Sequence, residues 1–154
     1  MQKTFLFIFC LALAFPVFGQ TAAEVDAILS ADTVSAAVLA RFALGAADLL
    51  PPELSGPDAE KAAYDMALQK GWITIPENKN ATLKDTAFII MCAFDLKGGL
   101  LYTWFKSPRY AYREMLYLKL IWGHADEAMP VTGQRLLMIL DKTVSYADRQ
   151  GGEK

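Results

Sequence analysis

The chain has 154 residues, a formal net charge of −2 and a hydrophobic fraction of 54%. This length is enough for one domain with a hydrophobic core of its own. The slightly acidic balance excludes a generically basic nucleic-acid-binding protein.

The N-terminus has the pattern of a secretory signal peptide. Lys3 precedes the apolar run 4–15, and small residues end at Gly19, which fits a cleavage site before Gln20. The apolar run is shorter than the ~20 residues that span a bilayer, so it does not predict a membrane anchor. We therefore expect residues 1–19 to be removed and the product to be exported to the periplasm or the cell envelope.

Removal of the signal peptide leaves 135 residues and a net charge of −3, because Lys3 is its one charged residue. Cys10 leaves with the signal peptide, so Cys92 has no partner for an intramolecular disulfide in the exported chain. Cys92 lies in an apolar run, which indicates a buried thiol that behaves as a small hydrophobe. Lipid modification of Cys10 is the alternative, although Phe9 stands where a lipobox has a small residue.

Two helices are predicted in the acidic first part of the mature chain. A capping box that begins at Thr21 predicts a helix to about Leu29. Asp32 and Thr33 offer a second N-cap, and apolar residues at every fourth position predict a helix from there to about Leu49. Two prolines follow and exclude its continuation.

Four further helices follow along the chain. Each is bounded by a capping residue or proline at its start and by glycine or polar residues at its end, the usual asymmetry of helix termini. Their expected bounds are about 58–70, 82–96, 108–122 and 132–146. Polar residues 147–154 then predict a flexible tail. The predicted helical domain therefore covers residues 20–146.

Two stretches of the chain repeat one helix–loop–helix pattern. Residues 62–96 align with residues 111–144, and Thr82 and Thr132 stand at the same place before an apolar helix. Residues 33–49 match the second helix of each unit and form a leading half-unit. Because such units bury their apolar faces only by stacking, we expect an all-α fold, a small bundle of stacked helix–loop–helix repeats with five to six short helices. The alternative is that alanine-rich amphipathic helices resemble one another by composition.

Several segments of the two units have a recognisable sequence. Residues 117–123 read Tyr-Leu-Lys-Leu-Ile-Trp-Gly and residues 129–132 read Met-Pro-Val-Thr. They resemble the end of the first helix and the approach to the second in the S-layer homology repeat, a module that anchors proteins to bacterial cell walls. Residues 97–100 (Lys-Gly-Gly-Leu) and 107–114 (Ser-Pro-Arg-Tyr-Ala-Tyr-Arg-Glu) are similar to segments of a related helical domain in exported spirochaete envelope proteins. The resemblance covers about residues 33–146 and implies a helical domain that binds a wall polysaccharide.

The chain departs from that family at its hallmark, the sequence Thr-Arg-Ala-Glu at the start of the second helix, whose arginine binds an anionic wall polysaccharide. The corresponding places read Thr-Leu-Lys-Asp at residues 82–85 and Thr-Gly-Gln-Arg at residues 132–135. Threonine is kept in both and the acid in one, but neither has arginine in its place. The resemblance therefore implies the architecture more firmly than the glycan ligand.

A basic and aromatic segment, residues 97–119, is the candidate binding site. It has five Lys or Arg residues and one Glu, a net charge of +4, whereas residues 20–65 have a net charge of −6. Aromatic rings cover the apolar faces of sugars, and guanidinium groups bind carboxylates through two parallel hydrogen bonds. The candidate ligand-binding residues are Tyr102, Trp104, Lys106, Arg109, Tyr110 and Arg113. The alternative is that Trp104, Phe105 and Tyr112 fill the gap between the two units and the cations are solvated.

The sequence contains no recognisable pattern of an enzyme or a metal site. His124 is the single histidine, and with Asp126 and Glu127 it indicates a surface loop rather than a zinc site. Asp48 and Asp95 recur at helix ends, where carboxylates oppose the helix dipole but are able to cap the turn that follows. We therefore expect a non-catalytic protein with no cofactor and no metal.

Two functions fit these features. The first is a non-catalytic exported envelope protein whose helical domain binds a cell-wall polysaccharide, peptidoglycan or another envelope component. The alternative is a periplasmic adaptor that binds another envelope protein and has no glycan ligand. Nucleic acid is not an expected partner, and no stretch of the mature chain is long and apolar enough to predict a membrane span.

Overall fold

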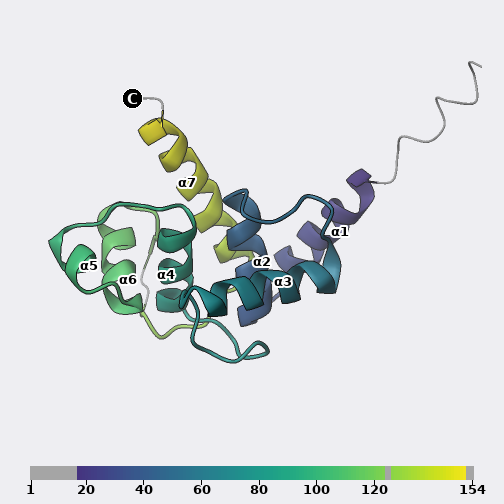
Figure 1. Ribbon diagram of the computed structural model, residues 1–154, viewed down its shortest axis with the longest axis horizontal. Helices are drawn as coiled ribbons and strands as arrows, with labels where there is room; N and C mark the ends of the chain where they lie inside the picture. Colours follow the sequence, from purple (N-terminus) through teal and green to yellow (C-terminus); the bar gives the residue numbers. More distant parts are fainter. Residues whose placement is uncertain (1–16, 124–125, 152–154) are drawn as a thin grey trace, which may run out of the picture.

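The computed structural model describes residues 17–123 and 126–151, and within these ranges the chain is all-α with no strand. The predicted signal peptide lies largely outside the described residues. Seven helices are described, in the following order: α1 (Val17–Leu29), α2 (Ala36–Ala46), α3 (Gly56–Gln69), α4 (Leu83–Ala93), α5 (Leu100–Trp104), α6 (Pro108–Tyr117) and α7 (Gly133–Gly151) (Figure 1). None of them is long and apolar enough to cross a membrane.

The sequence predicts five to six helices, but seven are described. The helix that was not predicted is the short α5, which follows two glycines. Two hydrogen bonds from the Thr103 side chain to the carbonyls of Gly98 and Gly99 hold its first turn. The described α1 begins at Val17 and includes the predicted cleavage site before Gln20. The α2 helix begins at Ala36 rather than near Thr33, because Val34 is used in backbone pairing instead.

The predicted ends of the last two helices are also wrong. The α6 helix ends at Tyr117 and not near residue 122, because Lys119 adopts a left-handed backbone (φ 58°) and the N–H of Leu120 returns to the Met115 carbonyl. The α7 helix continues to Gly151 through residues predicted to form a flexible tail. Its extension is held by a hydrogen bond from the Arg149 side chain to the Ser145 carbonyl.

Helices α2, α4 and α7 start in the same way, each after a hydroxyl residue. Ser35 Oγ accepts the Val38 N–H (3.3 Å), and Thr132 Oγ1 accepts the Arg135 N–H (3.2 Å). Thr82 forms the predicted capping box, in which its N–H donates to the Asp85 carboxylate (3.0 Å).

The residues before these three caps join in a closed ring of backbone hydrogen bonds. The N–H of Val34 donates to the carbonyl of Val131 (3.0 Å), and the N–H of Val131 donates to the carbonyl of Ala81 (3.0 Å). The N–H of Ala81 closes the ring by donating to the carbonyl of Val34 (2.8 Å). All three side chains are buried. The N-termini of α2, α4 and α7 therefore meet around one point in the core.

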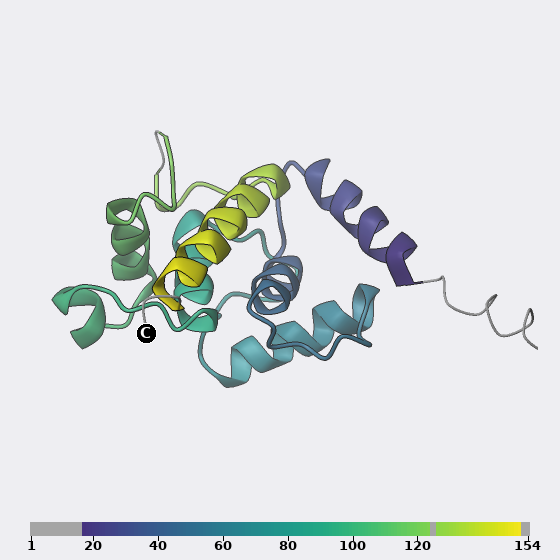
Figure 2. The same cartoon turned by 90° about the horizontal axis from the view of Figure 1, so that it is seen from above.

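The first backbone N–H of each central helix donates to a carbonyl in the loop that precedes another of the three helices. Buried backbone donors need such acceptors. The bonds run from Ala36 to the Lys79 carbonyl (2.9 Å), from Leu83 to that of Met129 (3.0 Å) and from Gly133 to that of Ala31 (3.0 Å). The outer helices follow the same order, because α3 packs on α2, α6 on α4 and α1 on α7. Figure 2 shows α2, α4 and α7 in the middle with α1, α3 and α6 around them.

Asp48 and Asp95 occupy matching places after α2 and α4. Both adopt a left-handed backbone, with φ of 54° and 47°. The N–H of the residue after each one returns to the carbonyl five residues earlier, from Leu49 to Leu44 and from Leu96 to Met91, both at 2.9 Å. This is the Schellman arrangement, and Asp tolerates the left-handed region better than most residues. The recurrence of an acid at these helix ends therefore follows from backbone geometry.

Candidate functional site

The structure separates the six predicted site residues into two groups. Tyr102 is buried, with 4% of its surface exposed, and Tyr110 is half-buried with its ring centroid 6.0 Å from that of Phe105. The other four are exposed, namely Trp104, Lys106, Arg109 and Arg113. The alternative that Trp104, Phe105 and Tyr112 are packing groups therefore holds for Tyr112, which is 6% exposed, and is wrong for Trp104 and Phe105, which are 74% and 56% exposed.

Tyr102 and Lys106 line a groove of about 380 Å³ between the end of α3, the last turns of α4 and helix α5. The other chemically distinctive side chains of this α4–α5 groove are Lys70, Trp72, Phe88, Cys92 and Asp95. Two ammonium groups, one carboxylate and three aromatic rings therefore face one concavity. Such a set suits a ligand with a negative charge and an apolar face, because rings cover C–H surface while lysines attract anions.

Backbone geometry at the end of α3 places Trp72 in this groove. Gly71 has φ of 69°, and the N–H of Trp72 donates to the Ala67 carbonyl (2.8 Å), so the chain turns sharply toward α4. The Lys70 ammonium lies 4.9 Å from the centre of the Trp72 ring. This cation–π contact holds the ammonium at the rim of the groove.

Tyr102 and Cys92 form the floor where α5 meets α4. The Tyr102 hydroxyl lies 3.8 Å from the Cys92 sulfur. Burial raises the pKa of the Cys92 thiol, and burial together with the neighbouring Cys92 raises the pKa of the Tyr102 hydroxyl well above its usual range. Both groups are therefore protonated at neutral pH, and Cys92 lacks the lowered pKa of a nucleophilic cysteine.

The groove residues Lys70, Trp72 and Phe88 were not among the predicted site residues. Lys70 and Trp72 lie at the end of α3 and Phe88 lies in the middle of α4, and only the tertiary fold brings them beside Tyr102 and Lys106. One sequence signal pointed to Trp72, since an aromatic residue follows the glycine that ends a predicted helix.

The exposed cations Lys106, Arg109 and Arg113 form no ion pair with another described residue. The salt bridges between described residues are Arg41–Glu24 and Lys61–Asp65, and neither involves Lys106, Arg109 or Arg113. These charges therefore remain accessible to a partner.

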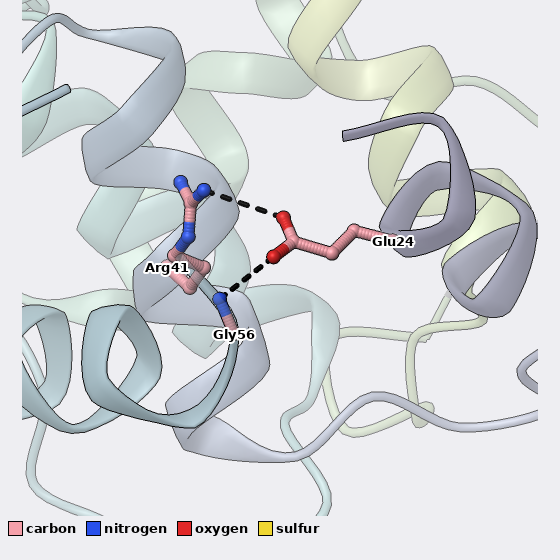
Figure 3. A network of polar contacts seen from close by, with 3 residues as sticks. All are labelled: Glu24, Arg41 and Gly56. Carbon is pink, nitrogen blue, oxygen red and sulfur yellow. Dashed lines mark hydrogen bonds and ion pairs between the residues drawn. The ribbon is translucent and has the colours of Figure 1, made fainter. Parts of the chain in front are cut away.

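A second cavity, of about 320 Å³, lies among α1, α2 and the start of α3. In it Glu24 accepts hydrogen bonds from the Arg41 guanidinium (3.3 Å) and from the Gly56 N–H (2.7 Å), as Figure 3 shows. Burial, followed by the nearby Glu24 charge, raises the pKa of Glu60, which also lines this cavity. One carboxylate thus ties α1 to both α2 and α3, which makes this network a structural junction.

Arg135, in the first turn of α7, has a structural role, because its side chain holds the loop after α6. Arg135 donates to the Trp122 carbonyl (2.7 Å), and the Asp126 side chain accepts the Ala128 N–H (2.8 Å). His124 lies outside the described residues. Over residues 17–123 and 126–151, no group of three His, Cys, Asp or Glu residues is arranged to hold a metal ion.

No protein-family model, curated protein or solved structure matches the chain.

Proposed function

We propose that this protein is a non-catalytic binding module of the cell envelope, which binds an anionic cell-wall polymer in the α4–α5 groove. The observation that carries the proposal is the groove itself, with the ammonium groups of Lys70 and Lys106 beside the rings of Trp72, Phe88 and Tyr102. A sugar polymer that bears carboxylate or phosphate groups offers both features that these side chains recognise.

The repeat architecture supports this proposal. We propose three units, α1–α2, α3–α4 and α6–α7, in which the first unit includes the half-unit at residues 33–49. The supports are the hydroxyl caps of α2, α4 and α7, the closed backbone ring of Val34, Ala81 and Val131, and the cyclic packing of the outer helices. Such a cyclic arrangement is consistent with the resemblance to S-layer homology repeats.

The residues that stand where the S-layer homology family has its ligand-binding arginine support ligand contacts that differ from those of the family. The first residues of the three central helices are Ala36, Leu83 and Gly133, and all three are buried. None of them is able to bind an anion through its side chain. In the proposed mode, Lys70 and Lys106 supply the charge that the family takes from arginine. Export through the predicted signal peptide would place the module beside such polymers.

Co-sedimentation of the purified protein with cell-wall sacculi tests the proposal. We expect binding at low salt and its loss at about 0.5 M NaCl, where charges are screened within a few ångströms. Lys70→Glu and Lys106→Glu should each weaken binding, whereas Lys79→Glu, the same charge change on an exposed loop outside the groove, should not. Equal binding of all three variants would contradict the assignment to the groove. Absence of binding by the wild type would favour the adaptor function.

A further inference from the structure

Helix α5 exposes apolar side chains that nothing in the described chain covers. Leu100 is 75% exposed and Trp104 is 74% exposed, and Leu101 and Phe105 are each more than half exposed. The helix packs chiefly against α6. It lies at the edge of the molecule in both views (Figures 1 and 2).

The orientation of α5 is fixed by Tyr102. Leu100, Leu101 and Trp104 follow the helical spacing i, i+1 and i+4, so they share one side, while Tyr102 points away from it. Because Tyr102 is buried with its hydroxyl near Cys92, the helix is unable to turn its apolar side inward without exposing this ring. The exposure of the apolar side is therefore built into the fold.

Basic residues flank this apolar side in the sequence. Four basic residues and no acidic residue occur between positions 97 and 113 of the sequence, namely Lys97, Lys106, Arg109 and Arg113. Two acids flank this stretch: Asp95, which lines the α4–α5 groove, and Glu114, whose carboxylate oxygen would lie 3.3 Å from a Cβ on Gly99, the residue before α5. Lys106 and Arg109 follow the apolar residues directly and are exposed.

We infer that α5 is a lipid-docking wedge, which inserts Leu100, Leu101 and Trp104 into the headgroup region of an anionic bilayer while Lys106 and Arg109 bind lipid phosphates. Tryptophan, leucine and basic residues together are the composition that partitions at a membrane interface. A five-residue helix offers much less than the ~800 Å² that each partner buries in a stable protein complex. The apolar side chains of this site lie on the side of α5 away from Tyr102 and the groove, whereas Lys106 also lines the groove, so the two proposed sites share this lysine.

Vesicle binding tests this inference with the whole protein. We expect sedimentation with vesicles that contain about 30 mol% phosphatidylglycerol and much weaker sedimentation with pure phosphatidylcholine, because each basic residue near an anionic surface strengthens binding about fivefold. Of the three tryptophans, Trp104 should report insertion by a blue shift of its fluorescence. Trp104→Phe should therefore abolish the shift, whereas Trp122→Phe should keep it.

A double variant and a matched control separate insertion from a general effect. Leu100→Ser with Trp104→Ser should weaken partition into anionic vesicles at least tenfold. Tyr117→Ser, which changes an 80% exposed aromatic residue at the far end of α6, should leave partition unchanged. Absence of binding by the wild type, or equal binding by the double variant, would overturn the inference. Concentration-dependent dimerisation that the double variant abolishes, without vesicle binding, would assign the surface to a second copy of the chain.

Discussion

Substitution of Gly133 by alanine should weaken the docking of α1 on the start of α7. Gly133 is the first residue of α7, and a Cβ there would lie 1.7 Å from the Ile28 carbonyl oxygen and 2.6 Å from its carbon. Real Cβ atoms essentially never approach another heavy atom closer than 3.0 Å, so α1 must retreat by more than an ångström. The obstacle is backbone, which is unable to move aside as a flexible side chain would.

The cost follows from two effects at this position. Overpacking of a filled interior costs typically about 1–3 kcal/mol. The same retreat stretches the bond from the Gly133 N–H to the Ala31 carbonyl (3.0 Å), and an unsatisfied buried donor costs a further 1–3 kcal/mol or so. We therefore expect a loss of about 2–6 kcal/mol, out of the 5–15 kcal/mol or so that stabilises a typical domain.

Thermal unfolding followed by circular dichroism measures this loss. We expect Tm to fall by about 10 °C or more, and amide hydrogen exchange in α1 to become faster. Gly71→Ala is the control, because Gly71 has φ of +69° and open space around its Cβ position, so it carries only the backbone penalty of about 1 kcal/mol. If Gly133→Ala lowers Tm no more than Gly71→Ala does, α1 does not pack on the start of α7 in solution, and the reasoning is wrong.

Three further predictions concern single groups. Asp48→Gly should raise Tm slightly, by about 0.5–1 kcal/mol of stability, because Asp48 has φ of 54°; a lower Tm would indicate a stabilising role of its carboxylate. Burial raises the pKa of Glu60 above 4.5, so the folded state holds this proton more tightly than the unfolded state and stability falls as pH rises through this window. Glu60→Gln should therefore stabilise the protein at pH 7 relative to the wild type but not at pH 4 (the two pH values on either side of the titration), and denaturant unfolding at both values checks the sign. Cys92, whose pKa burial raises, should react with iodoacetamide much more slowly in the folded than in the unfolded chain; equal rates would contradict its half-buried place beside Tyr102.

The helix starts were the part of the fold most accessible from the sequence. Thr82 and Thr132 were predicted as caps because a hydroxyl before an apolar period is a local signal, and the structure places both at helix starts. The cap of α2 was misplaced, since Asp32 and Thr33 have the same local signal as Ser35. The choice of Ser35 depends on the backbone ring through Val34, which is a long-range contact.

The candidate site was accessible only in part, for the same reason. The charge and exposure of Lys106, Arg109 and Arg113 followed from composition, because cations without partners are solvated. Tyr102 is buried and Trp104, two residues later, is exposed. This difference depends on how the one-turn helix α5 packs on α4 and α6. No periodicity is readable in so short an element.

The most direct test of polymer binding in the groove is an NMR titration of ¹⁵N-labelled protein with soluble fragments released from sacculi by a muramidase. We predict that the largest shifts will occur at the Trp72 indole N–H and at the backbone amides of Lys70 and Lys106, with little change around Glu24 and Arg41. Absence of shifts, or shifts confined to the cavity among α1, α2 and α3, would contradict the proposed function.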